Sequence, residues 1–374
     1  MSFSIVKQSY LENSSNIVTN GNLTVNGTVS SYLDISLNSM PENIASTFST
    51  FSSDVGKWAG GVLAPNGKIY GIPLNSTSVL IIDPVTNTTD TSTISGLGVG
   101  GNKWIGGVLA PNGKIYCMPN FSTSVMIIDP VTNTADTTTI SGLNGDAKYV
   151  GGVLAPNGKI YGIPYDSTSV MIIDPLTNTV DTNTITGLSA GGGKWAGGVL
   201  GPNGKIYGIP YNNTSVLIID PVTNTADTST ISGLSGGGKW ISGVLAPNGK
   251  IYCIPNSSVS VLIIDPVTNT ANINTIIGLT GSAKWGTGTL APNGKIYGIS
   301  RVSTSVLIID PVTNTADTTT ISGLSNLSLK WYGSVLAPNG KIYGIPFSAT
   351  NALVLNTGLP KYPTWMIKPV FNKY

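Results

Sequence analysis

The sequence of 374 residues contains no histidine, and its only glutamates, Glu12 and Glu42, lie near the start of the chain. Histidine is the commonest general base at neutral pH and the commonest metal ligand, so its absence removes the usual centre of hydrolytic and metal-dependent sites. Eleven of the fifteen aspartates recur at equivalent positions, whereas a single active site needs residues that differ from their counterparts. We therefore expect no enzyme activity, no bound metal and no cofactor.

Charge, cysteine and long apolar runs are also scarce. Charged residues make up 10% of the chain and the formal net charge is +2, which argues against a concentrated basic face for nucleic acid. The start of the chain lacks the apolar core of a signal peptide, and no apolar run is long enough to insert into a membrane. Cys117 and Cys253 occupy the same position of two distant repeats, so we expect small buried thiols rather than a disulfide. These features indicate synthesis in a reducing cytoplasm.

One heptapeptide dominates what is present. Ala-Pro-Asn-Gly-Lys-Ile-Tyr begins at Ala64 and returns six more times, at a step of 45 or 46 residues. Only Gly201 replaces its first residue. A fixed period of this size means that one supersecondary unit is stacked many times. The lysine of each copy marks the register: Lys68, Lys114, Lys159, Lys205, Lys250, Lys295 and Lys341.

Each repeat contains four short extended runs separated by turn signals. In the third repeat, these runs are predicted at 149–155, 159–163, 169–173 and 180–185, and no stretch has the 3.6-residue apolar period of a helix. Four antiparallel strands repeated seven times predict an all-β fold, a seven-bladed β-propeller of four-stranded antiparallel blades. The Thr-rich fourth run suits an outer strand with one exposed face.

Three features of the repeat have structural interpretations. Gly pairs such as Gly60-Gly61 suit innermost strands that converge on an axis. The aromatic residue that follows the first lysine, Trp58 in the first repeat, is interpreted as a wedge between blades, with a ring of sugar-binding platforms as the alternative. Lys68 and Asp83 should lie at the same end of a blade and form an ion pair or turn cap, with a catalytic or metal role as the alternative.

The seventh repeat lacks its fourth strand after residues 352–356. Residues 43–51 precede the first wedge aromatic, where every other blade has its fourth strand. We therefore expect an N-terminal strand to complete the last blade, because this pairing removes a free sheet edge. The predicted organisation is an N-terminal anchoring segment (1–40), the propeller (41–356) and an extended C-terminal tail (357–374).

The N-terminal segment alternates apolar Leu23, Val25 and Val29 with polar residues and Asn-Gly turns, too few apolar groups for a core of its own. We expect these three residues to anchor the segment, either on a partner chain or as an added strand. The run Gly-Asn-Leu-Thr-Val-Asn-Gly resembles segments of bacteriophage tail-fibre and other virion proteins. The C-terminal tail carries four aromatic residues among three prolines, as in a docking peptide.

The repeats themselves resemble the Asn-Gly-Lys-Ile-Tyr…Val-Leu-Ile-Ile-Asp-Pro propeller repeats of phages, large DNA viruses and some bacteria and protists. This resemblance covers residues 57–356 and brings no catalytic residues. The Trp-Asp dipeptide of WD repeats and the kelch Gly pair are missing.

Variation between the repeats points to one face of the propeller. The link between strands two and three differs in every blade and carries exposed aromatic residues beside amides, as sugar and protein recognition require. Neutral drift at loop tips is the alternative. The candidate recognition residues are Asn75, Phe121, Tyr165, Asp166, Tyr211, Asn212, Arg301 and Phe347.

These observations favour a non-enzymatic virion protein of a capsid, fibre or tail, which displays the propeller for host attachment. Its expected partners are other virion proteins, through residues 1–40 and the C-terminal tail, and a host glycan or receptor. The alternative is a free, lectin-like carbohydrate-binding propeller. A propeller hydrolase or lactonase is the least favoured hypothesis, because the inner strands supply no cluster of carboxylates.

Overall fold

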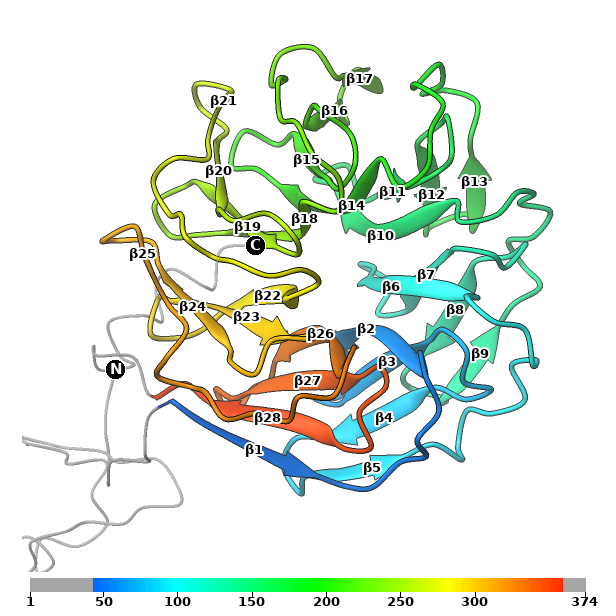
Figure 1. Cartoon of the computed structure of the whole chain (residues 1–374). Helices are drawn as coiled ribbons and strands as arrows, with labels where there is room; N and C mark the ends of the chain where they lie inside the picture. Colours follow the sequence, from blue (N-terminus) through cyan, green and yellow to red (C-terminus); the bar gives the residue numbers. More distant parts are fainter. Residues whose placement is uncertain (1–42, 359–374) are drawn as a thin grey trace, which may run out of the picture. The chain divides into compact units, whose positions relative to one another are not determined.

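The computed structural model describes residues 43–358, which form strands and connecting turns around one axis (Figure 1). The strands make seven four-stranded antiparallel sheets. Each inner strand contacts the inner strand of the next sheet, and the last, β26, contacts the first, β2, so the ring is closed. The prediction of an all-β, seven-bladed propeller is therefore confirmed. Within residues 43–358 there is no helix that could cross a membrane.

The strands have nearly equal bounds in every blade. The inner strands are β2 (Trp58–Leu63), β6 (Trp104–Leu109), β10 (Tyr149–Leu154), β14 (Trp195–Leu200), β18 (Trp240–Leu245), β22 (Trp285–Leu290) and β26 (Trp331–Leu336). The second strands are β3 (Ile69–Pro73), β7 (Ile115–Pro119), β11 (Ile160–Pro164), β15 (Ile206–Pro210), β19 (Ile251–Pro255), β23 (Ile296–Ser300) and β27 (Ile342–Pro346). The third strands are β4 (Leu80–Asp83), β8 (Met126–Asp129), β12 (Met171–Asp174), β16 (Leu217–Asp220), β20 (Leu262–Asp265), β24 (Leu307–Asp310) and β28 (Ala352–Asn356). The outer strands are β5 (Thr88–Asp90), β9 (Thr134–Asp136), β13 (Thr179–Asp181), β17 (Thr225–Asp227), β21 (Thr270–Asn272), β25 (Thr315–Asp317) and β1 (Ile44–Phe48).

Glycine is needed where the inner strands approach one another. Gly60 has φ of 96° and lies so close to the next blade that an added Cβ would be 2.9 Å from Cα of Gly106. Gly333 of the last blade meets Gly60 in the same way, at 2.8 Å. A side chain at these positions would force neighbouring blades apart and would strain the backbone. The Gly pairs therefore have the role that the sequence predicts.

The large aromatic residue that begins each inner strand is buried between blades. Trp58 is 3% exposed and packs with Tyr343 and Ile345 of the last blade, and its indole N–H donates to the carbonyl oxygen of Ser78 at 2.8 Å. Its counterparts in the other six blades are also at most 3% exposed. The wedge interpretation is confirmed, and the sugar-platform alternative is wrong because these rings do not reach the surface.

The last blade is completed by β1, as predicted. β1 pairs antiparallel with β28 over its full length, from Ile44 opposite Asn356 to Phe48 opposite Ala352. Phe48 also packs edge-on against the ring of Tyr343, with a centroid distance of 5.8 Å. The start of the described chain thus supplies the outer strand that the seventh repeat lacks, and the sheet gains its fourth strand.

The outer strands are shorter than expected. The run predicted as a strand over 180–185 is a three-residue strand that ends at Asp181. The Asp181 carboxylate accepts the backbone N–H groups of Asn183 and Thr184 at 2.7 and 3.1 Å, so it closes a turn that replaces the strand. This turn brings Ile185 into the core, where it is 3% exposed. Side-chain capping by aspartate therefore outweighs the β-propensity of the threonines.

Cys117 and Cys253 are both buried and unpaired, as predicted. Each lies on the second strand of its blade, where other blades have glycine. Burial raises the pKa of both thiols, which makes them poor nucleophiles. They are small core residues.

Candidate functional site

The strand order defines two faces of the ring. The hairpin between strands one and two and the turn between strands three and four open on the face that we call the constant face, because their sequences barely change. The link between strands two and three and the link between blades open on the opposite face, which we call the variable-loop face. The antiparallel order of every sheet fixes this division.

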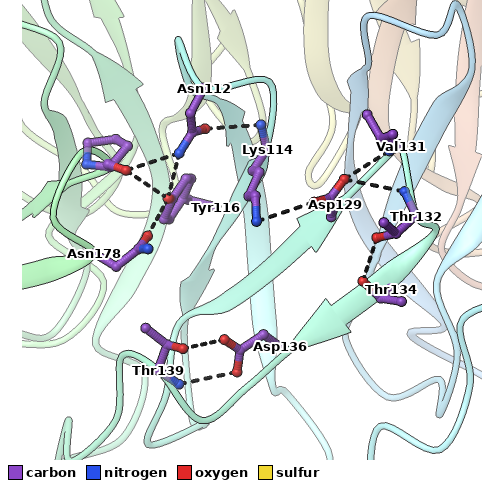
Figure 2. A network of polar contacts seen from close by, with 11 residues as sticks. Asn112, Lys114, Tyr116, Asp129, Val131, Thr132, Thr134, Asp136, Thr139 and Asn178 are labelled. Atoms are coloured by element: carbon purple, nitrogen blue, oxygen red, sulfur yellow. Dashed lines mark hydrogen bonds and ion pairs between the residues drawn. The ribbon is translucent and has the colours of Figure 1, made fainter.

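The constant motifs join neighbouring blades, as Figure 2 shows for blades two and three. The amide of Asn112 donates to the phenol oxygen of Tyr116 at 3.0 Å and to the carbonyl oxygen of Pro175 in the next blade at 3.0 Å. The Tyr116 hydroxyl donates to Oδ1 of Asn178 at 2.6 Å. Asn178 has φ of 53°, a left-handed conformation that asparagine tolerates well.

This arrangement, which we call the Asn-Tyr-Asn staple, occurs between every pair of neighbouring blades. In blade six its partners are the two ends of the described chain, because Tyr297 donates to Asn43 and Asn293 donates to the carbonyl oxygen of Thr357. The Asn and Tyr of the Asn-Gly-Lys-Ile-Tyr motif and the Asn of the Val-Thr-Asn motif therefore hold neighbouring blades together. The tyrosines that donate these hydrogen bonds are Tyr70, Tyr116, Tyr161, Tyr207, Tyr252, Tyr297 and Tyr343.

The repeated lysine and aspartate form the predicted ion pairs. Lys114 lies 3.2 Å from Asp129 (Figure 2), and equivalent pairs at 3.2 to 3.8 Å occur in blades one to six. The Asp129 carboxylate also accepts the N–H of Val131, and this hydrogen bond is the main cause of its lowered pKa, with a smaller effect of Lys114. Six equivalent, partly exposed pairs stabilise turns, and they do not single out one blade for catalysis.

A second lysine of each repeat is buried between blades, which the sequence did not reveal. The ammonium of Lys239 donates to the carbonyl oxygens of Tyr211, Asn213 and Gly236 at 3.1, 2.9 and 2.7 Å. Burial lowers the pKa of Lys239 to about 8. The lysine thus ties the blade link to the preceding blade and satisfies carbonyl groups that no strand uses. Its counterparts are Lys57, Lys103, Lys148, Lys194, Lys284 and Lys330.

Three of the candidate recognition residues use their polar groups within the fold. Asn75 donates to the carbonyl oxygen of Val55 at 2.9 Å and accepts the N–H of Asn102 at 2.8 Å. Asn212 makes the same two kinds of contact in blade four, and Asp166 of blade three accepts the N–H of Gly193 at 2.6 Å. These side chains hold the blade links in place and have less capacity left for a ligand.

Phe121 occupies the corresponding position in blade two and is 41% exposed. It borders a hollow of about 480 Å³ beside Lys103 and Trp104. A similar hollow of about 530 Å³ lies beside Lys57 and Trp58. Because equivalent hollows lie in blades one and two, neither hollow singles out one blade.

The other candidates meet at the axis. Tyr165 and Tyr211 lie side by side with a centroid distance of 5.8 Å, and both pack on a cluster formed by Val150, Ala196 and Ile241 of three inner strands. Tyr332 of the last blade packs on the same cluster. Residues of inner strands from opposite sides of the ring can touch only across the axis. Val150, Ala196, Ile241 and Tyr332 are each the second residue of an inner strand, and the inner strands begin at the variable-loop face. The cluster therefore lies at the axis on that face.

Arg301 and Phe347 complete this group. The Arg301 guanidinium lies over the rings of Tyr332 and Phe347, at 5.3 and 6.0 Å from their centroids. Tyr332 and Phe347 are themselves 5.8 Å apart. We call Tyr165, Tyr211, Arg301, Tyr332 and Phe347 the axial cluster.

The pKa of Tyr165 reflects the other side chains of the axial cluster. Burial, together with smaller effects of the Tyr211 and Tyr332 phenols, raises the pKa of Tyr165 to about 12, and the Arg301 guanidinium opposes this rise. Burial also raises the pKa of Tyr332, again opposed by Arg301. Both phenols are therefore neutral hydrogen-bonding groups at physiological pH.

The sequence identified four members of the axial cluster and missed Tyr332. A signal was available, because the residue after the wedge aromatic differs between repeats as much as the loops do. It reads Ala59, Ile105, Val150, Ala196, Ile241, Gly286 and Tyr332.

No group of three or more His, Cys, Asp or Glu side chains that could hold a metal ion occurs in residues 43–358. The anchoring candidates Leu23, Val25 and Val29, and most of the C-terminal tail, lie outside the described residues.

No protein-family model and no curated protein matches this sequence. Solved propellers are similar in fold. A streptogramin B lyase aligns with a TM-score of 0.67 at 13% identity, over 83% of this chain and 97% of the other. A catalytically inactive virginiamycin B lyase from Staphylococcus aureus aligns with a TM-score of 0.68 at 12% identity, over 84% and 99%. Hydrazine synthase from Kuenenia stuttgartiensis aligns with a TM-score of 0.60 at 16% identity, over 81% and 96%. At these identities the likeness concerns the fold alone.

Proposed function

We propose that this chain is a non-enzymatic attachment protein of a virus particle. Residues 1–40 anchor it to a capsid, fibre or tail protein, and the variable-loop face binds a host receptor or glycan. The placement of the two ends of the described chain is the observation that carries this proposal.

Both ends lie on the constant face. β1 starts at Ile44 opposite Asn356, the last residue of β28, so the chain enters and leaves where other blades have their turn between strands three and four. Figure 1 shows the start of β1 and the end of β28 side by side. In this proposal, the anchoring partner approaches the constant face and the receptor approaches the axial cluster on the opposite face. This geometry suits a propeller that is displayed on a particle.

A recognition role is supported by the loss of symmetry in the axial cluster. Structural features recur in all blades, whereas Arg301 is the single arginine of the sequence. Aromatic rings and one arginine in a partly buried group are typical of binding hot spots. An enzyme is less favoured, because the sequence has no histidine and the described aspartates are used in turns and blade links.

The test of this proposal is incorporation into particles. Particles depleted of the native chain are supplied with either the full chain or a chain lacking residues 1–40, and the copy number is measured by mass spectrometry. We expect the full chain to be incorporated and the shortened chain to be lost. Incorporation of the shortened chain at the normal copy number would contradict the anchoring role.

A free carbohydrate-binding propeller is the second candidate, favoured by the Tyr165 and Tyr211 pair. Sugar binding by the ring together with absence of the chain from purified particles would support this candidate over the first.

A further inference from the structure

The axial cluster contains a cation that the fold does not neutralise. Arg301 is partly buried, and no carboxylate among residues 43–358 forms an ion pair with it. Its Nε–H is buried and has no hydrogen-bond partner there. Stacking on Tyr332 and Phe347 fixes the guanidinium plane but uses none of its N–H donors. A buried donor without an acceptor is costly, so the arrangement indicates an acceptor that binds from outside.

A second unpaired donor lies one blade away. Asn256 occupies in blade five the link position that Arg301 occupies in blade six, and it is 2% exposed. Its Nδ2 has no hydrogen-bond partner in residues 43–358. In blade two, the equivalent Asn120 donates to the carbonyl oxygen of Tyr149 at 3.3 Å. Equivalent link positions of two neighbouring blades thus each hold a buried N–H donor without an acceptor, and such donors suit an oxyanion.

Arg301 reaches, through Tyr332, a group that is apolar at the axis and polar in the surrounding links. Val150 and Ile241, each 6% exposed, form the base together with Ala196, and the Tyr165 and Tyr211 rings stand on it. The links on this face consist largely of Ser, Thr, Asn and Gly. A ligand that fits has an apolar face for the rings, hydroxyl groups for the rim and one anionic group for Arg301. A pyranose with a carboxylate or sulfate substituent meets all three conditions.

We propose that the axial cluster binds an anionic saccharide, with Arg301 as the residue that selects the acid group. This inference rests on the proposed recognition function and names its ligand class. Tyr165 and Tyr211 provide the stacking surface, and Asn256 donates the second hydrogen bond to the anion. Carboxylated and sulfated sugars both carry an anionic group that Arg301 and Asn256 can bind.

The experiment is a binding titration of the full chain with matched probes. The probes are 3′-sialyllactose, 3′-sulfated lactose, neutral lactose and inorganic sulfate. The variants are Arg301→Gln and, as control, Lys295→Gln, which removes the same charge from the same blade on the constant face. Thermal melting of each variant checks the fold.

We expect at least one acidic trisaccharide or sulfated sugar to bind, and lactose to bind about tenfold or more weakly, since a charged hydrogen bond contributes about 1.5–3 kcal/mol. Arg301→Gln should abolish this preference and Lys295→Gln should keep it. Equal binding of lactose and the acidic sugars, or an unchanged preference in Arg301→Gln, would overturn the inference. Binding of inorganic sulfate as tightly as the sugars would show an anion site without sugar recognition.

Absence of binding by every saccharide would also overturn the inference. It would leave the virion proposal standing, because incorporation of the chain into particles depends on residues 1–40 and is measured separately.

Discussion

The two faces of this propeller are built from the same repeats but differ in how closely their residues repeat from blade to blade. On the constant face, the same Asn-Tyr-Asn staple joins every pair of blades, and six of seven blades repeat the same ion pair. On the variable-loop face, the link positions near the axis carry leucine, asparagine, tyrosine, arginine or phenylalanine. Repetition therefore marks residues that hold the ring together. Departure from repetition marks the candidate binding residues, of which Asn75, Asn212 and Asp166 also hold the blade links.

Removing the strand that closes the ring should give the largest loss of stability. We expect deletion of residues 1–52 to lower the melting temperature by on the order of 10 °C, because it removes β1 and the staple partner Asn43. The control is deletion of residues 1–40, which leaves β1 in place and should leave the melting curve unchanged. Equal melting of the two shortened chains and the full chain would show that β1 does not stabilise the ring.

The contact between inner strands comes next. Gly106→Ala places a Cβ 3.0 Å from Cα of Gly151 at a φ of 77°. We expect a loss of about 3 kcal/mol in the free energy of unfolding, from strain and overpacking together. Gly113 has a similar φ of 80° but nothing within 4 Å, so Gly113→Ala should cost only about 1 kcal/mol. Chemical denaturation measures both, and equal losses would mean that crowding at the axis is unimportant.

Replacing one tyrosine on each face by phenylalanine compares how much the two hydroxyl groups contribute to stability. Tyr116→Phe removes the hydroxyl that donates to Asn178 and should lower the free energy of unfolding by about 1–2 kcal/mol. Tyr211→Phe on the variable-loop face should change it by less than about 0.5 kcal/mol. Denaturant titration of the two variants tests the difference. A larger loss in Tyr211→Phe would contradict the assignment of stability to the constant face.

The smallest effect concerns pH. A hydrogen bond from Thr139 lowers the pKa of Asp136 in the folded protein to about 2, below its ordinary value of 3.8. The unfolded chain therefore binds the proton more readily, and the stabilisation present above pH 3.8 is lost as the pH falls towards 2. Asp136→Asn should reduce this pH dependence while keeping the turn, since Asn272 caps the same turn in blade five. Melting curves between pH 2 and 5 provide the test.

Repetition explains how much could be read from the sequence. The fold, the wedge of Trp58, the ion pair of Lys68 and the closing strand β1 all follow from comparing one repeat with another. The staple could not be predicted, because Asn112 and Pro175 are 63 residues apart and only the ring brings them together. The fourth strand was overestimated, because threonine favours strands while Asp181 favours a turn.

The axial cluster was predicted only in part for the same reason. Tyr165, Tyr211, Arg301 and Phe347 were identified one by one from loops that differ. Their convergence on Tyr332 and the apolar base depends on how seven inner strands meet at an axis. No local pattern of residues contains that information.

The central claim is that ligands bind at the axial cluster, on the face opposite the Asn-Tyr-Asn staples. The most direct measurement uses one variant that carries Asn at positions 165, 211, 301 and 347. Asn is the native residue at the equivalent position in two of the other three blades, as Asn120 and Asn256. Its melting temperature and its binding to 3′-sialyllactose and 3′-sulfated lactose are measured on the same sample. The account predicts complete loss of binding and a melting temperature that stays well above that of the chain lacking residues 1–52. Retained binding, or melting as low as that of the chain lacking residues 1–52, would contradict it.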